Sequence, residues 1–194
     1  MSYLALDLSK SSTGWALWRP GMSKPIFGVW HLGGPQTTRG AAALKLNRNL
    51  TDLRKVEKFD FMFVEAPVAH VKRRGTSERN VRLALSLHAH AESFASSKGM
   101  DNRFFEYTPG SWRPEFIGRD ENAMIKRAAK LAEKSASDPL KAACKERCRQ
   151  LGIQIRKDDE ADAVGVLTYG ILKRGITPPW LANETLRTPL EITK

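Results

Sequence analysis

The stretch YLALDLSKSSTGWALW, residues 3–18, contains two short apolar runs separated by a polar turn. Runs of this length, joined in this way, are typical of two strands in a hairpin. One residue is unusual for such a strand, because Asp7 lies between Leu6 and Leu8. A buried carboxylate must be paired, protonated or bound to a metal, since an isolated charge is costly to remove from water. The hairpin therefore predicts both the start of a sheet and a functional residue within it.

The remaining sequence predicts a mixed α/β fold. Apolar patterning predicts three further strands at 26–33, 59–67 and 103–109, and helices at 41–57, 77–98, 121–133, 139–151 and 159–173. A loop is expected between the last strand and residue 121, and no element from Gly175 onward. Three strands in a meander, followed by alternating helices and strands, predict a five-stranded mixed sheet flanked by helices, the order found in RNase H-like domains.

The composition narrows the class of partner. The 194 residues include 32 Lys and Arg against 21 Asp and Glu, which gives a net charge of +11 and a pI near 9.9. This excess favours a polyanion such as nucleic acid over a small-molecule substrate. No apolar run reaches the ~18–20 residues of a membrane span, and residues 1–8 do not resemble a signal peptide. We therefore expect a soluble cytoplasmic protein whose two cysteines, Cys144 and Cys148, are reduced.

The basic residues recur along the chain rather than in a tail. A solvated surface accounts for any one of them, but it accounts poorly for the whole excess. The residues predicted to bind nucleic acid are Lys72, Arg73, Arg74, Arg79, Arg82, Arg113, Arg119 and Lys126.

A second carboxylate ends the fourth predicted strand. Glu65 follows four apolar residues and precedes a proline. If the first and fourth strands are neighbours, Asp7 and Glu65 lie about 5 Å apart, one inter-strand spacing. Two adjacent anions repel each other, and a divalent cation removes that conflict.

The stretch DDEADAVGVLTYGIL, residues 158–172, adds two more carboxylates. Asp159 and Asp162 are three residues apart and share a helix face, whereas the apolar residues after them indicate a helix clamped against the sheet. Acids in a first turn can also serve only as caps, and this is the role expected for Asp158. Four carboxylates are hard ligands of the type that Mg²⁺ or Mn²⁺ prefers, and a pair of such ions about 3.5–4 Å apart can hydrolyse a phosphodiester.

Four motifs together resemble the RuvC-type Holliday junction resolvases, most closely the branch carried by phages. They are LALDLSKSSTGWAL (4–17), FMFVEAP (61–67), YTPGSWRPEFIG (107–118) with a Lys-containing helix after it, and DDEADAVGVLTYG (158–170). The resemblance runs from about Tyr3 to Arg174. It implies an RNase H-like nuclease domain over 1–174, with 175–194 as a C-terminal tail.

The resemblance also implies roles for residues and a substrate. The implied metal ligands are Asp7, Glu65, Asp159 and Asp162, and Lys126 is the implied helix lysine near the scissile phosphate. The implied protein is a homodimer that makes paired symmetric nicks in a four-way DNA junction, in a bacterial cell or a phage-infected host. Leu8-Ser9 stands where bacterial members carry Pro-Gly, and no aromatic residue closely follows Glu65.

Three alternatives remain at this stage. An RNase H-like nuclease acting on flaps or RNA–DNA hybrids shares the same carboxylates. An ATPase of the actin or Hsp70 kind needs two such halves, and 194 residues provide one. A junction-binding module without catalysis has no need for a repulsive acidic cluster.

Overall fold

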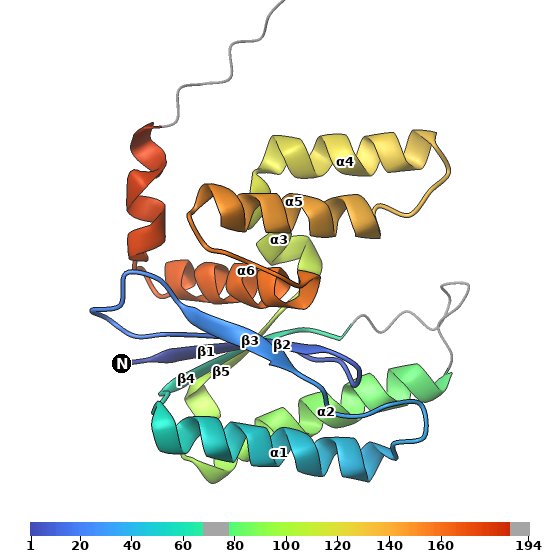
Figure 1. Ribbon diagram of the computed structural model, residues 1–194, viewed down its shortest axis with the longest axis vertical. Coiled ribbons are helices and arrows are strands. Elements are labelled where there is room, and N and C mark those ends of the chain that lie inside the picture. Colours follow the sequence, from blue (N-terminus) through green and yellow to red (C-terminus); the bar gives the residue numbers. More distant parts are fainter. Residues whose placement is uncertain (68–77, 187–194) are drawn as a thin grey trace, which may run out of the picture.

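The computed structural model describes residues 1–67 and 78–186, with side chains up to residue 182. Figure 1 shows the elements in chain order. The strands are β1 (Tyr3–Asp7), β2 (Thr13–Trp18), β3 (Ile26–Trp30), β4 (Phe61–Glu65) and β5 (Phe104–Tyr107). The helices are α1 (Arg39–Val56), α2 (Glu78–Ser97), α3 (Pro109–Ile117), α4 (Arg119–Leu131), α5 (Ser137–Gln150) and α6 (Asp158–Lys173), with short 3-10 helices η1 (Asp101–Arg103) and η2 (Pro179–Leu186).

The strands form one mixed sheet in the order β3-β2-β1-β4-β5. β2 pairs antiparallel with both β1 and β3, whereas β1, β4 and β5 run parallel. The predicted five-stranded mixed sheet is therefore confirmed, including the contact between the first and fourth strands. Parallel strands end at the same edge, so the chain leaves β1 and β4 side by side.

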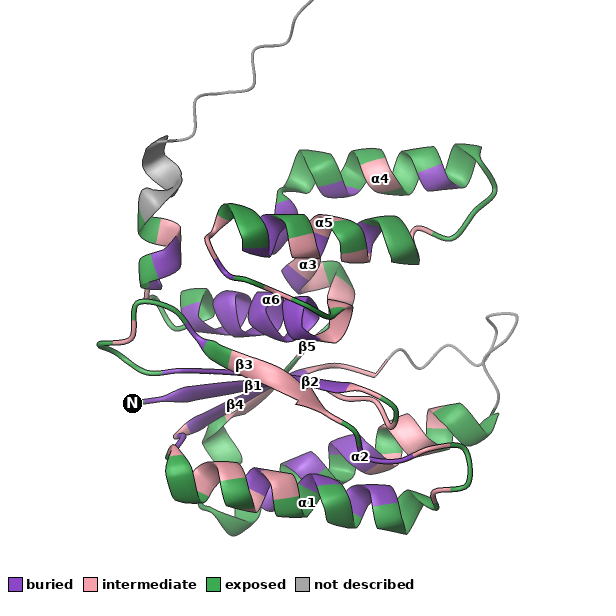
Figure 2. Ribbon diagram, viewed as in Figure 1, coloured by how far each residue is buried: buried purple, intermediate pink, exposed green. Residues whose placement is uncertain are grey.

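Helices cover both faces of this sheet (Figure 1). α6 lies across β1 and β2, with α3, α5 and α4 stacked beyond it, and α1 and α2 cover the opposite face. α6 is buried from Glu160 to Ile171 because it is enclosed between the sheet and these helices (Figure 2). The expectation of a clamped helix is confirmed. Within the described ranges, no helix combines the length and apolarity needed to cross a membrane.

The alternation of side chains along β1 and β4 decides which face each carboxylate occupies. Tyr3 and Ala5 belong to the core beneath α6, whereas Leu4 and Leu6 belong to the core beneath α1 and α2. By the two-residue period of a strand, the side chain of Asp7 points toward α6. Phe61 and Phe63 of β4 also face α6, so Glu65 points to the same side.

Two predictions about irregular segments were wrong. Residues 109–117, expected as a loop, form α3, which begins with Pro109 at its first turn and contains Pro114. Proline is well suited to a first turn, and a short helix tolerates the second one where neighbouring elements hold it in place. The segment after Gly175 also contains an element, η2. There Trp180 is buried edge-on against Trp18 and donates a hydrogen bond to Thr168 Oγ1 at 3.1 Å, so packing continues past residue 174.

Candidate active site

A close approach of β2 to α6 brings the two halves of the site together. Gly14 pairs with Asp7 across the hairpin, and a Cβ atom at Gly14 would overlap the carbonyl oxygen of Asp159. Only a residue without a side chain allows this approach. Thr13 closes the turn before it, since its Oγ1 accepts a hydrogen bond from the Ser9 amide at 3.1 Å and donates to the Ser9 carbonyl. The Thr13-Gly14 pair thus allows the first turn of α6 to pack beside the end of β1.

The structure brings all four predicted carboxylates into one cluster. β1 and β4 supply Asp7 and Glu65, and the first two turns of α6 supply Asp159 and Asp162. Burial raises the pKa of Asp7 well above its usual value, and repulsion from Glu65, Asp162 and Asp159 raises it further. These charges interact strongly because little solvent separates them. The carboxylates of the cluster therefore repel one another in the metal-free protein.

α3 contributes a cation and a hydrogen-bond donor to this cluster. Arg113 Nη2 donates to Asp162 Oδ2 at 2.9 Å and lies 3.8 Å from Glu65 Oε2. Trp112 Nε1 donates to the same Glu65 oxygen at 2.7 Å. Trp112 is fully buried, so its ring belongs to the core while its Nε1 serves the site. Arg113, predicted to contact a phosphate, faces the carboxylates in the structure, and α3 is the element that sequence reasoning missed.

Lys141 of α5 is a second cation at the site that the sequence did not reveal. Its Nζ lies 3.9 Å from Asp159 Oδ1, and its charge lowers the pKa values of Asp7, Glu65 and Asp162. The predicted helix lysine, Lys126, is an exposed residue of α4, and no described contact joins it to the four carboxylates. No pattern in α5 singled out Lys141, since basic residues occur throughout that helix.

The acids in the first turn of α6 have different roles, since some belong to the carboxylate cluster and others stabilise the start of the helix. Asp158, predicted to cap the helix, instead pairs with Lys145 at 3.2 Å. Glu160 takes the capping role, because its Oε2 accepts hydrogen bonds from the backbone amides of Arg156 and Lys157 at 2.9 and 3.0 Å. Asp159 and Asp162 are left to the carboxylate cluster, as predicted for that face of the helix.

The other predicted nucleic-acid-binding residues lie apart from the cluster. Arg79 and Arg82 are exposed in the first turns of α2. Arg119 is exposed in α4, where it makes an ion pair with Glu115. The basic run of Lys72, Arg73 and Arg74 lies outside the described residues. Phosphate binding by these side chains stays a prediction.

The donor set has the chemistry of a hard divalent-cation site. All four groups are carboxylates, and Asp162 Oδ1 is buried with no hydrogen-bond partner among the described residues; the nearby thiol of Cys144 is a weak donor. As the side chains stand, no three His, Cys, Asp or Glu residues in the described ranges are placed to share an ion. Arg113 occupies the second oxygen of Asp162. The residues fit Mg²⁺ or Mn²⁺ by ligand type. In the metal-free protein, the positive charge of Arg113 partly neutralises Asp162 and Glu65.

Glu65 makes the stability of the metal-free protein depend on pH. The pKa of Glu65 is raised from 4.5 to about 7, mainly by burial and further by repulsion from Asp162. Arg113, Trp112 and Lys141 lower it and so offset part of this shift. The folded state therefore binds a proton that the unfolded state releases, and stability falls as pH rises from about 4.5 to 7. Each pKa unit corresponds to about 1.4 kcal/mol, so the loss is up to roughly 3 kcal/mol.

We expect Glu65→Gln to remove this dependence. In EDTA, the free energy of unfolding of the variant minus that of the native protein should increase between pH 5 and pH 8, as urea denaturation would measure. A difference that stays constant over this range would contradict the raised pKa of Glu65.

The comparisons with solved structures concern nearly the whole chain. T. thermophilus RuvC in complex with Holliday junction substrate matches with a TM-score of 0.61 and 12% identity, covering 91% of this chain and 98% of RuvC. A second structure of Thermus thermophilus RuvC matches with a TM-score of 0.55 and 14% identity, covering 90% and 97%. The chain has the RuvC fold. No protein-family model and no curated protein matches the sequence, so the likeness to RuvC lies in the RNase H-like architecture.

Proposed function

We propose that the protein is a metal-dependent endonuclease that resolves four-way DNA junctions by paired symmetric nicks. The observation that carries the proposal is the cluster of Asp7, Glu65, Asp159 and Asp162 at one edge of a RuvC-like sheet. A strongly basic chain supports DNA as the substrate, because cationic surface supplies most of the binding energy for a polyanion. A similar structure holds a Holliday junction substrate, and the working place would be the cytoplasm of a bacterial cell or a phage-infected host.

The four carboxylates would hold two Mg²⁺ or Mn²⁺ ions. Bound there, the ions would supply a water nucleophile at neutral pH and offset charge on the leaving oxygen. Until metal and DNA arrive, Arg113 limits the repulsion between Glu65 and Asp162. With those carboxylates neutralised by bound cations, the Arg113 guanidinium would be free to donate to a phosphate oxygen. Lys141 lies on the Asp159 side of the same site.

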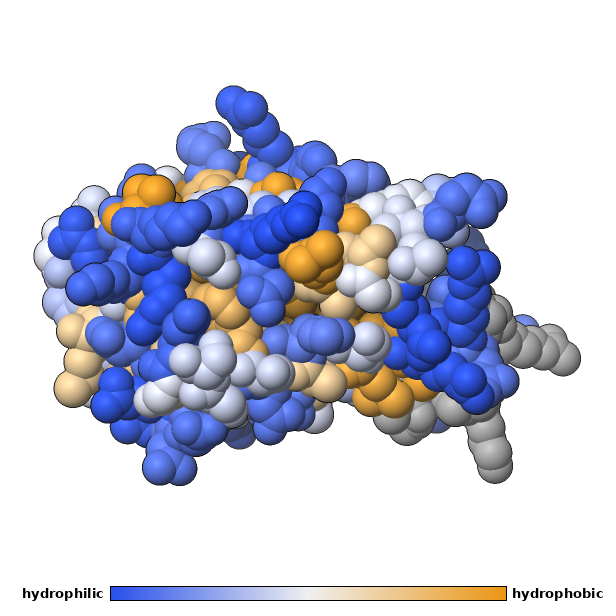
Figure 3. All heavy atoms as spheres, turned by 90° about the horizontal axis from the view of Figure 1, so that it is seen from below, coloured by the Kyte–Doolittle hydropathy of each residue, from blue (hydrophilic) through white to orange (hydrophobic). Residues whose placement is uncertain are grey.

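Paired nicks require two active sites, so we propose a homodimer. Figure 3 shows the face formed by α1 and α2, where hydrophobic groups lie among hydrophilic ones. The exposed apolar side chains there include Leu44 and Val56 of α1 and Leu85 of α2. This composition suits an interface with a partly apolar centre and a polar rim. The expected dimer helix is α2.

Cleavage of matched substrates tests the proposal. A synthetic mobile four-way junction is compared with a linear duplex, a flap and an RNA–DNA hybrid of the same sequence, each with Mg²⁺ or Mn²⁺. We expect preferred cleavage of the junction, with opposed nicks that DNA ligase reseals. Equal cutting of flap, hybrid and junction would instead support the alternative RNase H-like nuclease. Absence of cutting with either metal would contradict both.

A further inference from the structure

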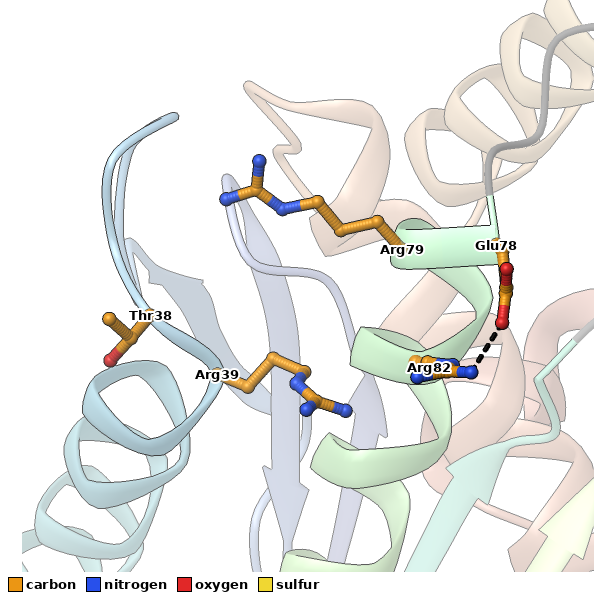
Figure 4. A pocket seen from close by; sticks show the side chains of 5 residues that line it. All are labelled: Thr38, Arg39, Glu78, Arg79 and Arg82. Atoms are coloured by element: carbon orange, nitrogen blue, oxygen red, sulfur yellow. Dashed lines mark ion pairs between the residues drawn. The ribbon is translucent and has the colours of Figure 1, made fainter.

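Three arginines surround a hollow at the edge of the α1–α2 layer. The hollow has a volume of about 460 Å³ and is lined by Thr38, Arg39, Glu78, Arg79 and Arg82, which we call the arginine pocket. Its residues come from the start of α1 and the start of α2, two elements that are far apart in the sequence. Figure 4 shows the guanidinium groups of Arg39 and Arg79 extending into the space between these elements.

The charges of the arginine pocket are not balanced by its own residues. Among the described lining residues Glu78 is the only acid, and it forms an ion pair with Arg82. Arg79 makes one long hydrogen bond, from Nη2 to the Pro35 carbonyl at 3.5 Å. Within the described ranges, Arg39 has no ion pair. The described lining residues carry three cations and one anion, a formal charge of +2. The guanidinium groups of Arg39 and Arg79 keep donors available for a ligand.

We propose that the arginine pocket binds a backbone phosphate of the DNA strand that enters the active site. The proposal rests on the proposed function for the identity of the polyanion. Guanidinium groups donate two parallel hydrogen bonds to phosphate oxygens, so two convergent arginines can hold one phosphate in a fixed position. Contacts of this kind set the register of a nucleic acid without reading its bases.

The position of the pocket relative to the carboxylates supports this assignment. A second hollow of about 310 Å³ lies between the β1–β2 turn and α2, and its lining includes Leu8, Ser9 and Asn80. Leu8 directly follows Asp7, and Asn80 directly follows Arg79. The second hollow therefore joins the start of α2 to the end of β1. This hollow lies on the α1–α2 side of the sheet, because Leu8 and Leu87 pack in that core. A strand held in the arginine pocket would therefore cross the β1–β2 turn to reach the carboxylate cluster on the α6 side.

The backbone ties the two regions together. The carbonyl of Lys10, in the β1–β2 turn, accepts hydrogen bonds from the amides of Leu32 and Gly33, each at 3.0 Å. Those residues lead into the segment that carries Thr38 and Arg39. These hydrogen bonds connect the segment before the arginine pocket to the turn that follows Asp7. We infer that the pocket sets which phosphate along the strand reaches the carboxylates.

The test compares Arg39→Gln with Arg48→Gln, both in the Asp7→Asn background so that no cutting occurs. Arg48 is also exposed and lies on α1, nine residues further on, and both changes remove one positive charge. Fluorescence anisotropy measures the dissociation constant of a labelled four-way junction over a range of salt concentrations. Loss of one phosphate contact should lower the slope of log affinity against log salt by about 1 for Arg39→Gln, and much less for Arg48→Gln. Equal slopes for the two variants would overturn the proposal.

Neutral linkages locate the contact on the DNA. A series of junctions, each with one methylphosphonate, removes one backbone charge at a time. At the position held by the pocket, the substitution should weaken binding to the protein with Arg39 more than it weakens binding to Arg39→Gln, in which Arg79 alone remains to contact the linkage. Additive effects at every position would overturn the assignment.

Other outcomes separate this inference from junction resolution. If binding of a linear duplex depends on Arg39 as strongly as binding of the junction does, phosphate binding by the arginine pocket is supported even when the protein does not resolve junctions. A titration with inorganic phosphate at constant ionic strength tests a small anion as the ligand. An increase in Tm that requires Arg39, without any effect of Arg39→Gln on DNA binding, would overturn the proposal in favour of a small-anion site.

Discussion

Asp7→Asn is expected to lower the rate of junction cleavage by more than about 100-fold, since even the groups that only orient metal ligands are worth 10–100-fold. Asp7 lies at the end of β1 near the other three carboxylates, so under the proposed function its loss would remove an oxygen ligand of the metal ions. The change also removes one of several repelling charges. The metal-free variant should therefore be at least as stable as the native protein, which thermal unfolding in EDTA would show.

Asp158→Asn is the matched control for this loss. Asp158 is next to Asp159 in the sequence, but its carboxylate is nearly half exposed and pairs with Lys145. Exposed pairs of this kind contribute at most about 1 kcal/mol. Cleavage by Asp158→Asn should remain within a few-fold of the native rate. A similar loss in both variants would mean that general charge, rather than ligation by Asp7, sustains activity.

Gly14→Ala should damage stability and cleavage together. The added methyl group would meet the Asp159 carbonyl and the Ala163 side chain, and backbone atoms cannot move aside as a flexible side chain does. Overpacking of this kind costs about 1–3 kcal/mol, which lowers Tm on the order of 5–10 °C in a chain of this size. Because α6 must shift from β2, Asp159 and Asp162 move away from Asp7, and we expect cleavage to fall about 100-fold.

Gly40→Ala provides the comparison for a glycine without such a contact. A Cβ atom at Gly40, in the first turn of α1, would meet no atom within 4 Å. Alanine there should leave Tm unchanged or raise it, because it reduces the freedom of the unfolded chain. If Gly14→Ala behaved like Gly40→Ala, the close approach of β2 to α6 would not determine the geometry of the site.

The sequence was sufficient to predict the sheet and the carboxylates because both follow from local pattern. Short apolar runs indicated β1 and β4, and Asp7 and Glu65 stood out at their ends. The spacing of Asp159 and Asp162 placed them on one helix face, which the structure turns toward the sheet. Each of these inferences needed only the period of a strand or a helix.

The cations at the site could not be predicted in the same way. Arg113 reaches Asp162 because residues 109–117 form a helix, whereas a loop was expected there. Lys141 approaches Asp159 because α5 packs on α6. The residue pattern of neither helix predicts that these two helices are in contact. Tertiary packing, rather than local propensity, selects which of the many basic residues serve the carboxylates.

The position of α6 in the chain has a consequence for biosynthesis. Its carboxylates are translated long after Asp7, and its buried face is completed by Trp180, which comes later still. Domains generally fold as units while the ribosome proceeds from the N-terminus. A nascent chain that has been translated only as far as β5 lacks two of the four clustered carboxylates. We expect the acidic cluster to be completed only near the end of translation, so under the proposed function partly made chains would not cut nucleic acid.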